Sequence, residues 1–176
     1  MRRLLIATLA SLAVLLLAIL PASAQRAQDR YVGYYYPSPN QIEVYCARVP
    51  RLQEASKKRR VGFIIGIKTG MTKKPYESPY TVFAKGGQST KLIIISKMEG
   101  YLNTVYRARA LLADLSTSAR TTPIFANSKA PEELTFLDLI SLLGFESVTL
   151  SDGDSFAHQI RLLSISSPNC KPKTNS

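Results

Sequence analysis

Short apolar runs recur along the chain, and most of them come in pairs with a few polar residues between. "YTVFAK" at 80–85 and "KLIIISK" at 91–97 are separated by the glycine-rich "GGQST", which predicts a β-hairpin. "FESVTLSDGDSFAHQIRLL" at 145–163 predicts a second hairpin, with its turn at 152–155. The run at 92–95 is continuously apolar, so we expect its strand to lie inside the sheet with cover on both faces.

Two further apolar runs precede these pairs. "VGFIIGI" at 61–67 is almost entirely β-branched, aromatic or aliphatic, which is typical of a strand buried on both faces. "KTGMTKKPYESP" at 68–79 follows, and its glycine and two prolines predict irregular chain. The weaker run at 42–46 ends an extended arm rich in tyrosine and proline, and we expect it to form an edge strand.

Two segments carry helix signals instead. Asn103 is placed to cap a helix that runs to about Ala119, with one apolar face made of Val105, Ala108, Leu112, Leu115 and Ala119. Thr135 and Asp138 stand at roughly capping-box spacing, and Gly144 follows the apolar residues Leu139, Ile140, Leu142 and Leu143. A second helix is therefore expected between Thr135 and Gly144, with its apolar face against the sheet.

Strands that arrive in adjacent pairs around two helices favour an α+β fold over a doubly wound parallel one. The expected architecture is a single domain with a mixed sheet of about five to six strands and two helices packed on it. The chain then divides into a leader (1–24), the arm with its edge strand (25–50), the α+β domain (51–163) and a polar C-terminal tail (164–176).

Residues 1–24 have the order of a secretory signal peptide. Arg2 and Arg3 precede the apolar run "LLIATLASLAVLLLAIL", and the small residues Ala22 and Ala24 predict cleavage before Gln25. The alternative is a retained membrane anchor, since this run just reaches the length that spans a thinned bilayer. The A-x-A ending favours cleavage, which predicts an exported protein, periplasmic or secreted, with no stable membrane span.

The chain is strongly basic, with a formal net charge of +11 that falls to +9 when Arg2 and Arg3 leave with the leader. Such a surplus favours anionic partners. For an exported protein we expect these to be an envelope protein or an anionic surface, and not nucleic acid. The predicted anion-binding patch consists of Arg48, Arg51, Lys57, Lys58, Arg59 and Arg60. The alternative for such a run is a solvated connector.

The chain has two cysteines, Cys46 and Cys170. Export brings them to a compartment where disulfides persist, so we expect them to be bonded to each other; two unpaired thiols are the alternative. Neither cysteine has a second Cys or a His at ligand spacing, so they predict no metal site.

The stretch "RRVGFIIGIKTGMTKKP" at 59–75 is close to a phosphate-binding P-loop but fails its spacing. That motif needs four residues between its glycines and a lysine directly after the second one. Gly62 and Gly66 are separated by three residues, and Ile67 stands between Gly66 and Lys68. We therefore expect no nucleotide here. On a strand both glycines would share one face, where the missing side chains let a helix approach closely.

The turn "SDGDSFAH" holds Asp152, Asp154, Ser155 and His158, the residue types of a hydrolase site. On a strand, however, Ser155 and His158 point to opposite faces, and Asp154 and His158 lie about 13 Å apart at ~3.3 Å per residue. His158 lies on the more apolar face, so its expected role is that of a hydrogen-bonded core residue. Asp152, Asp154 and His158 remain a candidate polar site, and we predict no catalytic residue, metal or cofactor.

Several segments resemble a family of small exported bacterial proteins of unclear role: "YVGYYYP", "FAKG", "LNTVYRARALLADLSTSARTTPIF", "TFLDLISLLGF" and "SDGDSFAHQIRL". The resemblance covers 31–162. Members are often labelled molybdopterin-guanine dinucleotide biosynthesis protein A, which implies a transferase that joins GMP to molybdopterin with GTP and magnesium. Such enzymes look like Rossmann-type folds that begin with a strand and an L-x-G-G-x-S-x-R-M-G loop. This chain has no such loop, so no catalytic or nucleotide-binding residue carries over from the label.

These observations favour a non-catalytic binding or assembly accessory protein of the cell envelope. One alternative is the molybdopterin-guanine dinucleotide transferase that the family label implies, against which the leader and the missing loop weigh. The other is a hydrolase that uses His158 with residues brought from elsewhere in the fold.

Overall fold

The computed structural model describes residues 39–126 and 132–170. The elements in chain order are β1 (Gln41–Cys46), α3 (Lys57–Thr72), β2 (Tyr80–Lys85), β3 (Lys91–Ser96), α4 (Val105–Arg120), α5 (Pro123–Ala126), α6 (Phe136–Leu142), β4 (Ser147–Ser151), β5 (Ala157–Leu163) and the 3-10 turn η1 (Pro168–Cys170). They form the predicted α+β fold with a five-stranded mixed sheet, although the described residues hold four α-helices instead of two. The predicted signal peptide and the tyrosine-rich arm lie outside the described residues.

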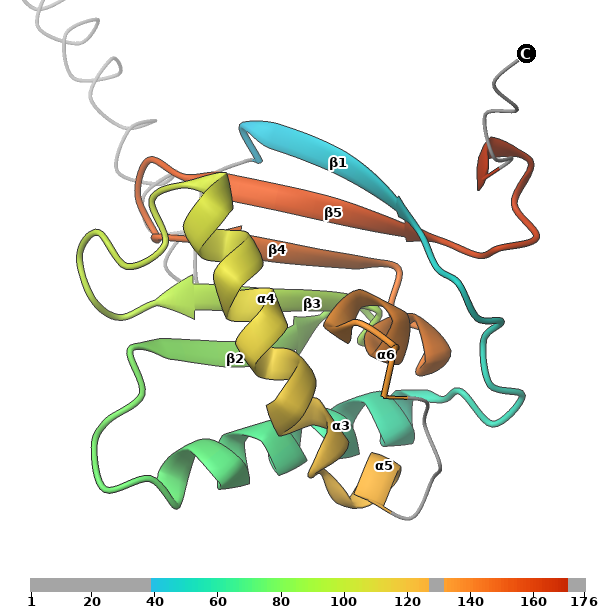
Figure 1. Ribbon diagram of the computed structural model, residues 1–176, viewed down its shortest axis with the longest axis horizontal. Coiled ribbons are helices and arrows are strands. Elements are labelled where there is room, and N and C mark those ends of the chain that lie inside the picture. The colour runs from blue at the N-terminus through green and yellow to red at the C-terminus, as the bar shows by residue number, and fades with distance from the viewer. Residues whose placement is uncertain (1–38, 127–131, 171–176) are drawn as a thin grey trace, which may run out of the picture. The chain divides into compact units, whose positions relative to one another are not determined.

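The strands follow the order β1-β5-β4-β3-β2 across the sheet (Figure 1). β2 pairs antiparallel with β3, and β4 pairs antiparallel with β5, so both predicted hairpins are confirmed. Parallel pairing joins β3 to β4 and β1 to β5. The first and last strands of the described chain are therefore neighbours, and β1 is an edge strand, as expected.

The continuously apolar run at 92–95 lies in β3, an interior strand. Leu92 and Ile94 point toward the helices and belong to the main core. Ile93 points to the other face by strand alternation and is also buried, with 1% of its surface exposed. Burial on both faces accounts for the lack of polar alternation in this strand.

The prediction of a strand at 61–67 is wrong. This stretch forms the interior of helix α3. Ser56 caps the helix by accepting a hydrogen bond from the backbone N–H of Arg59. Phe63, Ile64 and Ile67 then fall at the helical spacing of one face and are buried. Ile65, between them, is 59% exposed. The run is uniformly apolar because an apolar side chain also occupies the outer face of the helix, which hides the helical period.

Two glycines of α3 let a neighbouring segment approach closely. They lie on one face of a helix and not, as the sequence predicted, on one face of a strand. Gly62 and Gly66 are one turn apart. A Cβ atom on Gly66 would lie 3.2 Å from the side chain of Thr122, which precedes α5. On Gly62 the nearest atom would be a methyl group of Ile124 at 3.7 Å. The glycines therefore let α5 and its connection lie directly against α3.

Helices α4 and α6 match their predicted positions closely. The cap of α4 is Thr104 rather than Asn103, and its side chain accepts a hydrogen bond from the backbone N–H of Arg107. α6 begins with the predicted capping box, in which Thr135 and Asp138 each accept a hydrogen bond from the backbone N–H of the other. In Figure 1, α4 and α6 lie over one face of the sheet. The apolar side chains between these helices, α3 and the sheet form one core.

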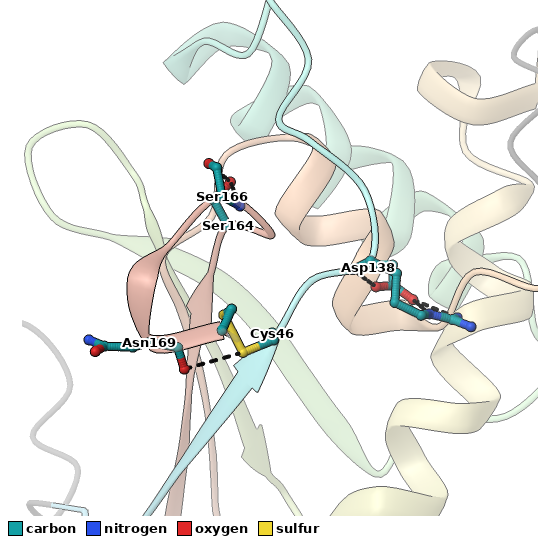
Figure 2. The surroundings of a disulfide bond; sticks show 7 residues. Cys46, Asp138, Ser164, Ser166 and Asn169 are labelled. Carbon is teal, nitrogen blue, oxygen red and sulfur yellow. Dashed lines mark hydrogen bonds and ion pairs between the residues drawn. A yellow bond between two sulfur atoms is a disulfide. The ribbon is translucent and has the colours of Figure 1, made fainter. Parts of the chain in front are cut away.

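The last described residues are joined to the first strand by a disulfide, as predicted. Cys46 at the end of β1 is bonded to Cys170 in η1, with their Cα atoms 5.5 Å apart (Figure 2). The bond fixes the tail beside the edge of the sheet. None of the helices within 39–126 and 132–170 has the length and apolar character that crossing a membrane requires.

Candidate functional site

A carboxylate, an imidazole and a guanidinium meet at the helix-covered face of β1 and β5. The parallel register places Glu43 beside Ile160 and therefore diagonal to His158. Glu43 Oε2 lies 3.1 Å from His158 Nε2 and 3.1 Å from Arg109 Nη2, which comes from α4. Because a carboxylate only accepts, His158 donates from Nε2. Three elements that are distant in the sequence thus contribute one charged cluster.

The environment of Glu43 keeps it ionised. Burial acts to raise the pKa of this carboxyl, but the hydrogen bonds from Arg109 and His158 and the positive charge of Arg109 outweigh burial and lower its pKa below the usual value. A general acid or base that works near neutral pH needs a pKa near that pH. Glu43 is therefore suited to holding Arg109 and His158 in place and not to proton transfer.

His158 is a core residue, as the sequence predicted. Its side chain is 5% exposed, and its ring stacks on that of Phe156. With Nε2 donating to Glu43, the other ring nitrogen, Nδ1, is buried and has no hydrogen-bond partner within the described residues. The imidazole is thus held by one bond to Glu43 and is shut off from solvent.

A second charged cluster lies around Asp138 at the start of α6. Its fully buried carboxylate accepts hydrogen bonds from the backbone and side chain of Arg48, with Arg48 Nη2 at 2.7 Å. It also accepts hydrogen bonds from Thr135 and from the hydroxyl of Tyr45. Burial alone would raise the pKa of Asp138, but the hydrogen bonds from Arg48 and Thr135 outweigh burial and lower it.

A cavity of about 500 Å³ opens between these two clusters, and we call it the Glu43 pocket. Its apolar walls come from α4, from the segment before α6, from the start of α6 and from β5, namely Leu112, Leu134, Phe136 and Ile160. Charged residues surround them, namely Glu43, Arg109, Arg120, Glu132 and Glu133. A volume of this size is typical of sites that hold a small molecule or a single large side chain.

The cations of the Glu43 pocket are already engaged. Arg109 is 63% exposed and is paired with Glu43. Arg120 donates from Nη2 to the carbonyl oxygens of Glu132 and Leu134, which fixes the segment before α6 against the end of α4. The pocket therefore offers an apolar interior whose two guanidinium groups are already engaged, one by a carboxylate and one by backbone carbonyl groups.

The candidate polar site of Asp152, Asp154 and His158 is not assembled into one site by the fold. Asp152 accepts hydrogen bonds from the backbone N–H groups of Asp154 and Phe156 and from the hydroxyl of Ser155. Burial acts to raise the pKa of Asp152, but these bonds lower it overall. The carboxylate of Asp152 thus shapes the turn between β4 and β5, to which Asp154 contributes its backbone N–H, while His158 pairs with Glu43 inside the fold.

The predicted basic patch divides into structural and exposed parts. Arg48 is paired with Asp138. Arg60 is buried and donates to the carbonyl oxygens of Gln88 and Leu143. Arg51 donates to the carbonyl oxygen of Gly144, directly beside the bonds of Arg60. These three arginines hold the start of the domain to α6 and to the β2–β3 loop.

The remaining members of the basic patch lie on the first turn of α3, where Lys57 and Lys58 are exposed and Arg59 is half-buried. This turn contains no acidic residue. The three side chains therefore add to the positive field that the amide groups create at the start of a helix. A role in binding an anionic surface stays a prediction for these three residues.

Sequence reasoning missed Glu43, Arg109 and Tyr45 as site residues. The available signal was the strand prediction at 42–46, in which Glu43 and Tyr45 alternate with apolar residues and so share one face. It could not show that this face is the buried one. That depends on the pairing of β1 with β5, which brings together residues 115 positions apart.

Within the described residues, no group of three or more His, Cys, Asp and Glu side chains lies close enough to hold a metal ion. Comparison of the chain with protein-family models, with curated proteins and with solved structures found no match. Any function must therefore be inferred from the chain's own geometry.

Proposed function

We propose that this protein is an exported, non-catalytic binding protein of the cell envelope and that its partner inserts an apolar group into the Glu43 pocket. One observation carries the proposal: an apolar cavity of about 500 Å³ in whose wall the guanidinium of Arg109 is already paired with Glu43. Glu43 holds Arg109 and His158, and Arg120 holds two carbonyl groups. Such a site provides buried apolar area for affinity and charged edges for specificity.

The charges at the edge of the Glu43 pocket favour a partner whose inserted apolar side chain stands next to a positively charged residue. Glu132 and Glu133 are exposed there, and the guanidinium of Arg120 is engaged by carbonyl oxygens. Three carboxylates therefore face two guanidiniums in the pocket walls. A leucine- or phenylalanine-sized side chain next to lysine or arginine on an envelope protein fits this balance of charges.

Two features support an exported protein. The leader at 1–24 has the order of a signal peptide. The bond between Cys46 and Cys170 belongs to a compartment that preserves disulfides. By contrast, the stretch that most resembles a nucleotide loop lies inside α3, which lends no support to the transferase implied by the family resemblance.

The pocket is tested by filling it from an exposed position. Ala113 is an exposed residue of α4 that lines the pocket, and Ala110 is an exposed alanine of the same helix that does not. We expect Ala113→Phe to abolish capture of the partner from envelope extracts and Ala110→Phe to leave it unchanged. Both variants should keep the melting temperature of the unmodified protein within a few degrees, because neither replaces a buried side chain.

Equal capture by all three proteins would show that the pocket is not the binding site. Tight binding of GTP by the purified protein would argue for the transferase instead. A reporter enzyme that is active only after export, fused behind residue 24, tests localisation separately: its inactivity would contradict the exported location without bearing on the pocket.

A further inference from the structure

A second cavity, separate from the Glu43 pocket, is lined by the C-terminal part of the stretch at 59–75 that resembles a P-loop. It has a volume of about 480 Å³ and lies where the end of α3, the α3–β2 connection, the start of β2 and the end of β3 meet. Lys68, Lys74 and Lys97 reach it from three of these segments. We call this cavity the lysine pocket.

The charges of the lysine pocket do not cancel. Lys97 forms an ion pair with Glu77, with Nζ and Oε1 2.7 Å apart. The hydrogen bond and charge of Lys97 lower the pKa of Glu77, so this pair is ionised and neutral overall. The side-chain ammonium groups of Lys68 and Lys74 make no hydrogen bond or ion pair with another residue of the described ranges. Two positive charges are thus left without a partner in one cavity.

The walls of the lysine pocket are partly apolar. Met71, Pro75, Tyr76 and Tyr80 contribute carbon surface, and Tyr76 is 67% exposed. An exposed ring at the wall of a cavity offers a flat surface for a second ring. Tyr80 is buried and stacks on Tyr101, and burial raises its pKa to about 12, so it contributes a neutral phenol. The cavity therefore combines a cationic part with an aromatic part.

We propose that the lysine pocket binds an organic phosphate monoester, with the phosphate between Lys68 and Lys74 and the organic group against Tyr76. A phosphate monoester carries close to two negative charges at neutral pH, which matches the two unpaired ammonium groups. A carboxylate supplies only one. This proposal goes beyond the Glu43 pocket and does not depend on it.

A structural role for these lysines is the competing explanation. Lysines near the C-terminal end of a helix stabilise the partial negative charge of its carbonyl groups, and Lys68 and Lys74 lie on either side of the last residue of α3, Thr72. That role requires no ligand. It predicts that removing the lysines lowers stability without affecting the binding of any phosphate.

The test is calorimetric titration of the purified, disulfide-bonded protein with phenyl phosphate at low ionic strength. We expect saturable binding that weakens at least tenfold in the double variant Lys68→Ala/Lys74→Ala. The matched control is Lys91→Ala/Arg161→Ala, which removes two positive charges from exposed positions of β3 and β5, outside the pocket and outside the predicted basic patch. It should bind phenyl phosphate within twofold of the unmodified protein.

Three results would overturn the proposal. Equal weakening of binding in both double variants would assign it to the overall positive charge of the protein. Equal affinity for inorganic phosphate and phenyl phosphate would show that the site does not bind the organic group. The third is failure to bind either phenyl phosphate or vesicles that contain phosphatidic acid. Two results would support the proposal and identify the source of the phosphate ester. Vesicle binding that is lost only in Lys68→Ala/Lys74→Ala would indicate a lipid head group. Saturable binding of phenyl phosphate without vesicle binding would indicate a soluble phosphate ester.

Discussion

Asp138 connects the start of α6 to the segment that follows β1. Its carboxylate closes the local capping box with Thr135 and also receives three hydrogen bonds from Arg48, a residue 90 positions earlier. Figure 2 shows Asp138 at the start of its helix beside this segment. The side chain is fully buried, whereas Arg48 is half exposed. The bonds from Arg48 and Thr135 thus compensate for the burial of this one carboxylate.

Replacing Asp138 with asparagine should lower the free energy of unfolding by about 2–3 kcal/mol at neutral pH, because bonds to a charged acceptor are lost. The folded state lowers the pKa of Asp138, so its contribution is complete above the usual pKa of 3.8 and is lost as the pH falls through the folded value. The difference between the two proteins should therefore shrink between pH 5 and pH 2. Urea unfolding across this range measures it.

Asp154→Asn is the matched control, since it removes one aspartate charge from an exposed turn. We expect it to change the unfolding free energy by less than about 0.5 kcal/mol at any pH in this range. A difference between the unmodified protein and Asp138→Asn that stays constant with pH would show that the carboxylate of Asp138 contributes no charge-dependent stability.

The sequence could predict only the local part of each charged cluster. Thr135 and Asp138 are three residues apart, so their capping box follows from spacing alone. Arg48 looked like one member of a surface patch, because its partner is set by the packing of α6 against the chain after β1. The pairing of Glu43 with His158 depends in the same way on two strands from opposite ends of the domain.

At the scale of elements, α3 shows where sequence patterns fail. Both hairpins and α6 have signals within a few residues: a glycine-rich loop, an Asp-Gly turn and a capping box. α3 has a cap at Ser56, but its apolar run continues around the helix through Val61 and Ile65, which are exposed. Such a run lacks the period that separates a helix from a strand buried on both faces. The apolar run alone is as short as a strand. Its length would have favoured a helix only if the polar residues on both sides of the run had been included in the element.

The two packed glycines of α3 give a direct test of its helical assignment. Alanine has a higher helix propensity than glycine by about 1 kcal/mol, so Gly62→Ala should raise the free energy of unfolding by up to that amount. Its new Cβ would be 3.7 Å from Ile124, an ordinary contact. Gly66→Ala should gain clearly less, because its Cβ would be only 3.2 Å from two carbon atoms of Thr122. Thermal and urea unfolding of both variants measure the difference.

Each variant serves as the control for the other, since the residues lie one turn apart on the same helix. If both alanines lower stability and shift the circular dichroism away from helix, α3 is not the element described. If Gly66→Ala gains as much as Gly62→Ala, Thr122 moves freely and the approach of the α5 connection to α3 is not tightly packed.

At the scale of the whole molecule, the sheet brings the two ends of the described chain together. β1 pairs in parallel with β5, and Cys46 stands opposite Leu163, the last residue of β5. The disulfide then joins Cys46 to the tail seven residues beyond that strand (Figure 2). The native neighbours of Cys46 are thus held by a strand ladder as well as by the covalent bond. We infer that the bond acts mainly on the unfolded chain, where it closes a loop with a sequence separation of 124 residues.

Loss of the disulfide should therefore lower stability strongly and change the native fold little. In the chain-entropy description a loop of this length contributes roughly 4–5 kcal/mol, so the double variant Cys46→Ser/Cys170→Ser should lose about that much free energy of unfolding. Its circular dichroism and the amide exchange protection of the central strand β4 should remain native.

A second variant that ends after Leu163 and carries Cys46→Ser separates two explanations. If both variants have the same stability, the tail contributes only through its covalent bond. If the shorter one is much less stable, contacts of the tail itself support β1. A loss below about 1 kcal/mol in the double serine variant would contradict the loop-closure account.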